Sequence, residues 1–173
     1  ARCQLASVDL GSNSFRLLVA EVHESSAGPQ MRLLDQIKET VRLGAGLDQQ
    51  RELSQEAQQR ALDALGRFSE RLRGFELDTV RAVATNTVRV ARNSAGFLQQ
   101  ARRALGYPIE VIAGGEEARL IYVGAAHSLP QDGRMRMIVD IGGGSTECIV
   151  GVDHEPQRRE SLQMGCVAMT REF

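Results

Sequence analysis

Hydrophobic positions along the chain follow two spacings, one typical of strands and one typical of helices. Alternating apolar residues at 4–10 and 15–22 predict two strands. In the second run both alternating sets of side chains are largely apolar, Phe15, Leu17 and Val19 on one side and Leu18, Ala20 and Val22 on the other. A strand with two apolar faces is expected to be covered on both sides of its sheet.

Helical spacing occurs in three segments. Ser54 is a predicted N-cap, and apolar residues follow at steps of three and four up to Leu72, before Gly74. Further helices are predicted over 94–105, closed by Gly106, and over 116–127. Shorter apolar runs at 31–38, 79–84, 107–113 and 135–141 predict strands. The resulting order, β-β-β-α-β-α-β-α-β-β, indicates a mixed α/β sheet with helices on its faces.

Composition narrows the class of protein. The 173 residues are 42% hydrophobic and 25% charged, which is typical of a globular chain with room for one domain, or one and part of another. A net charge of −1 argues against a general nucleic-acid or membrane-surface binder, and 4% aromatic residues argue against a base-stacking surface. The sequence shows neither a signal peptide nor an apolar run of about 18 residues.

Cysteine and histidine usage points to neither disulfides nor a metal centre. The cysteines are odd in number and form no CxxC pair, which predicts a reduced, cytoplasmic protein: Cys3, Cys148 and Cys166. The histidines lack ligand spacing and are interpreted as surface or cap residues: His23, His127 and His154.

A glycine-containing element occurs twice. "VDLGSNSFRLLVA" at 8–20 and "VDIGGGSTECIVG" at 139–151 align without a gap at an offset of 131, since 139 − 8 = 131. Glycine lets successive backbone N–H groups surround an anion, and an Asp before such a turn can hold Mg²⁺. Strand-like runs follow both glycine segments, and GxxxxGK[ST] is absent, so hairpins are favoured over a P-loop or dinucleotide fingerprint.

An ordinary hairpin turn is the alternative for either copy alone, because Gly, Asn and Ser are common in turns. Two gap-free copies favour a shared function instead. We therefore expect two phosphate-binding hairpins, one in each half of a duplicated architecture, facing each other across a cleft.

The chain resembles the superfamily of actin, sugar kinases and Hsp70, and within it the exopolyphosphatase/guanosine pentaphosphate phosphatase family. The resemblance rests on segments in the family's order: "VDLGSNSFRLLVAEV", "VRAVATNTVRVARN", "VIAGGEEARLIYVGAAH", "IVDIGGGSTECIVG" and "SLQMGCVAMT". It implies a ribonuclease H-like (actin-like ATPase) domain over 1–125. Residues 126–173 would be the truncated start of a second similar domain, making the chain an N-terminal fragment.

The same resemblance implies exopolyphosphatase activity. Terminal orthophosphate would be released from polyphosphate by Mg²⁺-assisted attack of water in the cleft between the domains. The alternative substrate is guanosine pentaphosphate (pppGpp), hydrolysed at its 5′-phosphate. Two further alternatives are a phosphotransferase of the superfamily and a non-catalytic polyphosphate or alarmone-binding regulator. A homodimer through parts of the protein outside this chain is left open.

The resemblance implies catalytic roles for three residues. Glu117, in "EEARL", matches the family's catalytic base, although an acidic pair also suits any helix start. Glu147 matches a second acidic residue, with a solvent-facing hairpin residue as its alternative. Arg89 matches an arginine that contacts phosphate, whereas taken alone it would be interpreted as a surface residue.

The hairpins supply the remaining candidates. Asp140 is the preferred Mg²⁺ ligand, and Asp9 is its equivalent in the first copy. Arg16 stands in the first copy where Glu147 stands in the second, so the copies differ where one acid is needed. The expected phosphate-binding backbone comprises Gly11, Ser12, Asn13, Ser14, Gly142, Gly143, Gly144, Ser145 and Thr146.

Overall fold

The chain folds into two compact units. The computed structural model describes residues 2–25 and 28–172, and the units divide after Val111. The first unit therefore ends earlier than the expected boundary at residue 125. Helix α4 (Gly114–Ala126) accounts for the difference, because its buried residues Ala118 and Tyr122 pack with Ile149 of the second unit.

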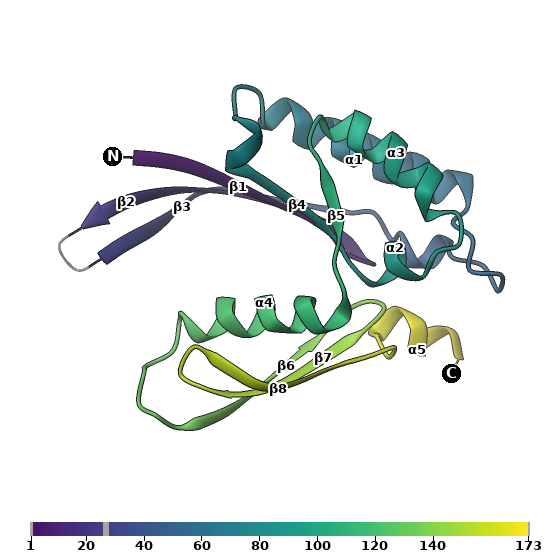
Figure 1. Ribbon diagram of the computed structural model, residues 1–173. Helices are drawn as coiled ribbons and strands as arrows, with labels where there is room; N and C mark the ends of the chain where they lie inside the picture. Colours follow the sequence, from purple (N-terminus) through teal and green to yellow (C-terminus); the bar gives the residue numbers. More distant parts are fainter. Residues whose placement is uncertain (1, 26–27, 173) are drawn as a thin grey trace. The chain divides into compact units, whose positions relative to one another are not determined.

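A five-stranded mixed sheet forms the first unit, in the order β3-β2-β1-β4-β5. Strands β1, β2 and β3 pair antiparallel, and β4 and β5 continue the sheet in parallel. This arrangement confirms the expected α/β fold (Figure 1). The strands are β1 (Arg2–Leu10), β2 (Ser14–Ser25), β3 (Gly28–Thr40), β4 (Val80–Ala84) and β5 (Ile109–Val111).

Two helices, α1 (Gln55–Arg71) and α3 (Ser94–Leu105), cover one face of this sheet (Figure 1). The Ser54 side chain caps α1 by accepting a hydrogen bond from the Ala57 amide at 3.3 Å, as predicted. Gly106 ends α3 with φ +82°, a conformation that favours glycine. Short connecting elements complete the unit: η1 (Gly44–Gly46), η2 (Leu77–Thr79) and α2 (Asn86–Val90).

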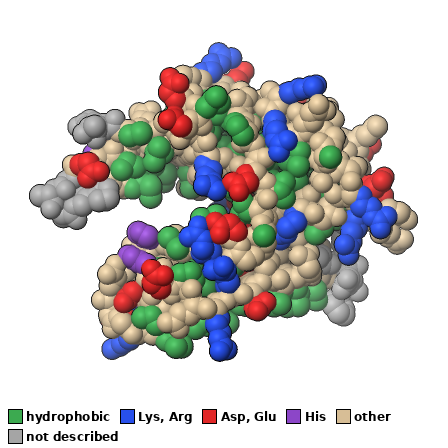
Figure 2. Space-filling model, viewed as in Figure 1, with side chains coloured by type: hydrophobic (Ala, Val, Ile, Leu, Met, Phe, Trp, Pro, Cys, Tyr) green, Lys and Arg blue, Asp and Glu red, His purple; other side chains and the backbone are tan. Residues whose placement is uncertain are grey.

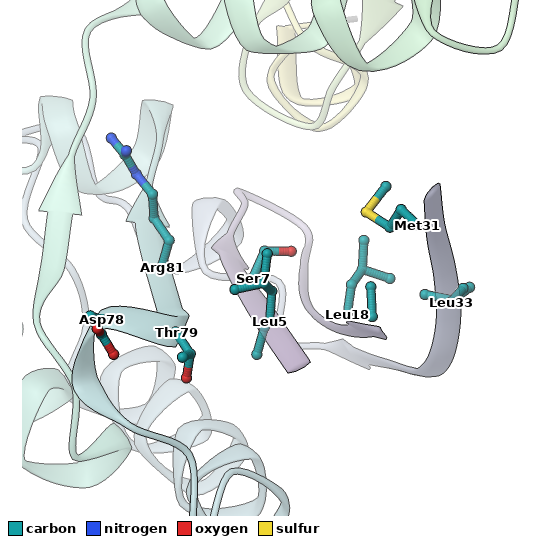
Figure 3. A pocket seen from close by; sticks show the side chains of 10 residues that line it. Leu5, Ser7, Leu18, Met31, Leu33, Asp78, Thr79 and Arg81 are labelled. Atoms are coloured by element: carbon teal, nitrogen blue, oxygen red, sulfur yellow. The ribbon is translucent and has the colours of Figure 1, made fainter. Parts of the chain in front are cut away.

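Helices cover one face of the first sheet, whereas the other face is partly exposed. Phe15, Leu17 and Val19 of β2 are buried against the helices, whereas Leu18 on the other face is 36% exposed. This second face contains a pocket of about 560 Å³ (Figure 3). The expectation that β2 is covered on both sides is therefore wrong for the described residues of this unit. The pocket is lined mainly by apolar side chains of three strands, including Leu5, Leu18, Met31 and Leu33.

A three-stranded antiparallel sheet forms the second unit, in the order β6 (Met135–Ile141), β7 (Thr146–Val152) and β8 (Glu155–Leu162). Helix α4 packs on it, and the chain continues into α5 (Cys166–Glu172). Tyr122 of α4 is fully buried and lies against Gly151, where an added Cβ would come within 2.5 Å of the tyrosine ring. Glycine on β7 thus creates the space for this aromatic anchor.

The pairing registers show that the two units repeat one hairpin. Leu10 pairs with Phe15 at the end of the first hairpin, and Ile141 pairs with Thr146 at the end of the second. These pairs are related by the offset of 131 found in the sequence. The same offset relates Ile149, which α4 covers, to Leu18 on the uncovered face of the first sheet.

Charged side chains are dispersed over the face of the molecule shown in Figure 2. Figure 2 shows basic and acidic groups interspersed among the other residues, without a continuous area of one sign. Among the described residues, no helix combines the length and apolarity needed to cross a membrane.

The core under α1 gives a test of the first unit. Replacing the fully buried Phe68 by alanine is expected to lower the free energy of unfolding by about 3–5 kcal/mol, because it leaves a cavity between α1 and the sheet. Urea denaturation followed by circular dichroism measures the loss. Leu77→Ala is the control, because Leu77 is 66% exposed and its truncation should change stability by less than about 0.5 kcal/mol. Equal losses would contradict the assigned core.

Candidate active site

The first glycine loop joins β1 to β2 through Gly11, Ser12 and Asn13. Glycine is required at its first position, since a Cβ there would lie 2.8 Å from the Ser14 carbonyl oxygen. The carbonyl oxygens of Ser12 and Asn13 accept hydrogen bonds from backbone amides of residues 41–44. The Gly44 amide donates to Ser12 O at 2.8 Å, and the Val41 and Arg42 amides donate to Asn13 O at 3.1 and 2.8 Å.

A side-chain hydrogen bond ties this loop to α2. The Thr87 hydroxyl donates to Ser12 Oγ at 2.7 Å, and both residues are buried. Among the residues that the structure describes, the loop amides of Gly11, Ser12 and Asn13 donate to no backbone carbonyl. The loop is therefore supported through its carbonyl oxygens, whereas an anion would be bound through amides.

The second glycine loop joins β6 to β7 and starts with the same close contact. A Cβ on Gly142 would lie 3.0 Å from the Ser145 carbonyl oxygen, to which the Gly142 amide donates at 2.9 Å. Within the described part of the chain, the amides of Gly143, Gly144 and Ser145 donate to no backbone carbonyl. Each predicted phosphate loop is thus a tight hairpin turn in which three amides of the described chain donate to no backbone carbonyl.

Residues 164–167 support this second loop. The Cys166 and Val167 amides donate to Gly142 O and Gly143 O, each at 2.9 Å, and the Thr146 hydroxyl donates to the Met164 carbonyl. A Cβ at position 165 would lie 2.4 Å from backbone atoms of Gly143 and Gly144, so only glycine fits there. The stretch "MGCV" within the segment "SLQMGCVAMT" is thus a support for the second glycine loop.

Both loops therefore depend on a segment that follows the third strand of their own sheet. Residues 41–44 follow β3, and residues 164–167 follow β8. Each supporting segment contains a glycine close to its loop, Gly44 in the first unit and Gly165 in the second. We refer to these two stretches as the supporting segments. The internal repeat thus extends beyond the hairpins detected by alignment.

Three polar residues lie in register across the second sheet. Asp140 on β6 pairs with Glu147 on β7, which pairs with Ser161 on β8. Asp140 is exposed, whereas Glu147 is 1% exposed and its Oε1 accepts a hydrogen bond from Ser161 Oγ at 2.7 Å. Glu147 is therefore not a solvent-facing hairpin residue. Ser161 was not singled out in the sequence because its partner lies on another strand.

The matching row of the first sheet carries different charges. Asp9 on β1 pairs with Arg16 on β2, and Arg16 pairs with Lys38 on β3. Arg16 and Lys38 are both exposed. The register confirms that Arg16 and Glu147 are equivalent positions, and the two copies differ at the third strand as well.

Glu116 and Glu117 occupy the first turn of α4. The Glu116 carboxylate forms a two-point ion pair with Arg119 at 2.7 and 2.8 Å, and this hydrogen bonding raises the pKa of Arg119. Glu117 is half-buried, and its amide donates to Ala113 O at 2.9 Å. The Glu116 amide donates to the same carbonyl at 3.0 Å, so both acids are anchored in the first turn of α4 through their backbone.

Arg89 lies on the short helix α2, in the first unit. It is half-buried, and its amide donates to Thr85 O at 3.0 Å. The Thr87–Ser12 hydrogen bond links the same helix to the first glycine loop. The structure thus brings Arg89's helix together with the first loop, and Asp140 and Glu147 together with the second.

The described residues contain no cluster of three or more His, Cys, Asp or Glu suited to a metal. His127 and His154 stack at 4.3 Å between ring centroids, and the cysteines are free thiols. A cation that needs only one or two protein carboxylates remains compatible with Asp140 at its exposed strand end. Mg²⁺ is such a cation, since it keeps waters and binds substrate phosphates.

Paired glycine hairpins carried by related α/β units place the chain in the class of proteins with an actin-like ATPase fold. The sequence model of the Ppx/GppA phosphatase family matches residues 18–173, and the chain belongs to this family. A crystal structure of an exopolyphosphatase from Cytophaga hutchinsonii has a TM-score of 0.88 at 30% identity, covering 99% of this chain and 54% of its own.

Curated relatives carry two kinds of name. A Haemophilus influenzae protein provisionally named an exopolyphosphatase is 44% identical over 170 residues, 98% of this chain and 51% of its own length. A guanosine-5′-triphosphate,3′-diphosphate pyrophosphatase of Vibrio vulnificus is 48% identical over 168 residues, 97% of this chain and 33% of its own. The chain thus spans between a third and a half of these relatives.

The glycine at the second supporting segment gives a local test. Gly165→Ala is expected to displace the loop backbone, because the added Cβ would overlap Gly143 and Gly144. Amide hydrogen exchange should become faster at Gly142, Cys166 and Val167, whose amides are hydrogen-bonded at this contact. Hydrogen–deuterium exchange with mass spectrometry measures the change. Gly124→Ala is the matched control, since nothing lies within 4 Å of its added Cβ. Unchanged exchange in Gly165→Ala would show that the contact does not hold the loop.

Proposed function

We propose that the protein is a metal-dependent phosphoanhydride hydrolase that releases terminal orthophosphate from inorganic polyphosphate. The observation that carries this proposal is the pair of supported glycine loops, in which carbonyls accept hydrogen bonds from the supporting segments while, among the described residues, the amides at 11–13 and 143–145 donate to no backbone carbonyl. Membership in the Ppx/GppA phosphatase family supports the reaction class. The names of the Haemophilus and Cytophaga relatives support polyphosphate as substrate.

Binding of the substrate would fall to the loop backbones. Fixed N–H groups stabilise phosphate oxygens without reorganising during the reaction, which is an efficient form of electrostatic catalysis. The proposed donors are those of Gly11 to Ser14 and Gly142 to Thr146. Arg89 would add a guanidinium that neutralises charge on the transferring phosphoryl group.

Glu117 is the proposed general base. Water attacking a terminal phosphorus needs a carboxylate that orients it and accepts its proton. The neighbouring Glu116 forms an ion pair with Arg119, and Glu117 is chosen because it matches the family's catalytic base. Glu147 is proposed as the second acid, assisting the water or a metal-bound water.

Asp140, with Asp9 as its counterpart in the first unit, would hold Mg²⁺. Both carboxylates sit at a strand end next to a glycine loop, and Asp140 is exposed. When bound, the cation would neutralise negative charge on the phosphate chain. The chain's own residues would still orient the water and take up its proton.

A second candidate is hydrolysis of the 5′-phosphate of guanosine pentaphosphate. It is favoured by the Vibrio vulnificus relative, which bears the guanosine-5′-triphosphate,3′-diphosphate pyrophosphatase name and is 48% identical. Both substrates present a terminal phosphoanhydride, so the same loops and base would serve either. Residues that recognise a guanosine would distinguish them.

The general base is tested by a pair of adjacent substitutions in the full-length protein. Glu117→Gln is expected to lower kcat about 10²- to 10⁴-fold on polyphosphate with Mg²⁺, because it removes the proton acceptor. Glu116→Gln breaks the Arg119 ion pair and should keep kcat within about twofold, since exposed pairs contribute little. Phosphate release measures both. If Glu117→Gln stays fully active, Glu117 is not the base.

Substrate comparison separates the alternative functions. Wild-type protein is incubated with polyphosphate, with guanosine pentaphosphate, and with ATP plus acceptors, and orthophosphate is followed in each. Faster release from polyphosphate supports the proposal, and faster release from guanosine pentaphosphate supports the second candidate. Transfer from ATP to an acceptor without release would indicate a phosphotransferase, and binding without turnover would indicate a regulator.

A further inference from the structure

The buried carboxylate of Glu147 receives a hydrogen bond from a neighbouring strand. Ser161 on β8 lies directly opposite it in the strand register, and Ser161 Oγ donates to Glu147 Oε1 at 2.7 Å. Glu147 is 1% exposed, while Ser161 is partly buried. Among the described side chains, Ser161 is the one that donates to this carboxylate. The contact therefore joins the proposed second acid to a residue outside the glycine motif.

A buried carboxylate needs such a donor for a physical reason. Removing an ionised carboxyl group from water is costly unless hydrogen bonds replace those of the solvent. A glutamate side chain also has several rotatable bonds, and a fixed donor restricts them. Because β7 and β8 are paired along the sheet, the backbone of Ser161 is fixed opposite Glu147, which keeps its hydroxyl within reach of the carboxylate.

The first unit shows what a different residue would do at this position. Its equivalent row is Asp9, Arg16 and Lys38, so a cation stands where the second unit has Ser161. A lysine facing Glu147 would pair with the carboxylate and neutralise it. Serine instead donates through a neutral hydroxyl and leaves the negative charge available for chemistry.

We infer that Ser161 is a positioning residue for Glu147. Its hydroxyl fixes Oε1, so that the second oxygen, Oε2, is presented to the attacking water or to a metal-bound water. This inference rests on the proposed function for its catalytic consequence. The geometric part, that Ser161 sets the conformation of Glu147, stands independently of the substrate.

Three variants of the full-length protein test the catalytic part. Ser161→Ala is expected to lower kcat on polyphosphate about 10- to 100-fold, because a misplaced catalytic group loses orientation, with KM within about twofold. Ser161→Thr keeps the hydroxyl and should restore kcat to within about threefold of wild type. Ser128→Ala removes an exposed hydroxyl after α4 and should match wild type. Thermal unfolding is measured for each variant.

The outcomes are distinct. A fall in kcat at constant KM and melting temperature, with recovery by threonine, supports a positioning role. Wild-type kcat in Ser161→Ala overturns it. A parallel loss of kcat and melting temperature in both Ser161 variants also overturns it, because that pattern indicates a purely structural contact.

A crystal structure of Ser161→Ala tests the geometric part without any assay. The Glu147 carboxylate is expected to leave its wild-type rotamer or to occupy more than one. An unchanged, fully occupied rotamer would overturn the inference. If the wild-type protein hydrolyses none of the offered substrates, the proposed function fails, and this structure still decides whether Ser161 holds Glu147.

Discussion

Both candidate phosphate loops depend on one constraint, the anchoring of loop carbonyls by a segment from later in the chain. In the first unit the amides of Val41, Arg42 and Gly44 make these bonds, and in the second those of Cys166 and Val167. A loop held through its acceptors has its peptide units fixed before a ligand arrives, so binding costs little ordering of the backbone. The glycines in each loop allow the tight turn, and the supporting segment keeps it in place.

The two units show how a duplicated scaffold acquires different chemistry. Both units have the same strand register, the same glycine loop and a supporting segment. The row of paired residues across the strands differs, with Asp, Arg and Lys in the first sheet and Asp, Glu and Ser in the second. The same loop geometry occurs twice, and the two sheets differ in the side chains at the second and third positions of this row. The buried, hydrogen-bonded Glu147 is the clearest such difference.

The spacing of apolar residues predicted the order of the main elements, and the gap-free alignment of the two glycine segments predicted that the hairpins are equivalent. The edge strand β8 was not predicted, because most of its residues are polar and exposed. The compact units divide after Val111 and not near residue 125, because helical spacing shows that α4 has an apolar face but not which sheet it packs on. The Ser161–Glu147 and Thr87–Ser12 bonds join distant segments, and nothing in either segment alone signals them.

The sequence separation of these supports has a consequence for how the protein forms during synthesis. The second loop obtains its support from a residue 24 positions later, since 166 − 142 = 24. The first loop's hydroxyl bond spans 75 positions, between Ser12 and Thr87. Closing the longer connection costs more chain entropy. The first glycine loop leaves the ribosome before the second. It nevertheless needs a longer stretch of following chain to be synthesised before all of its supporting hydrogen bonds can form.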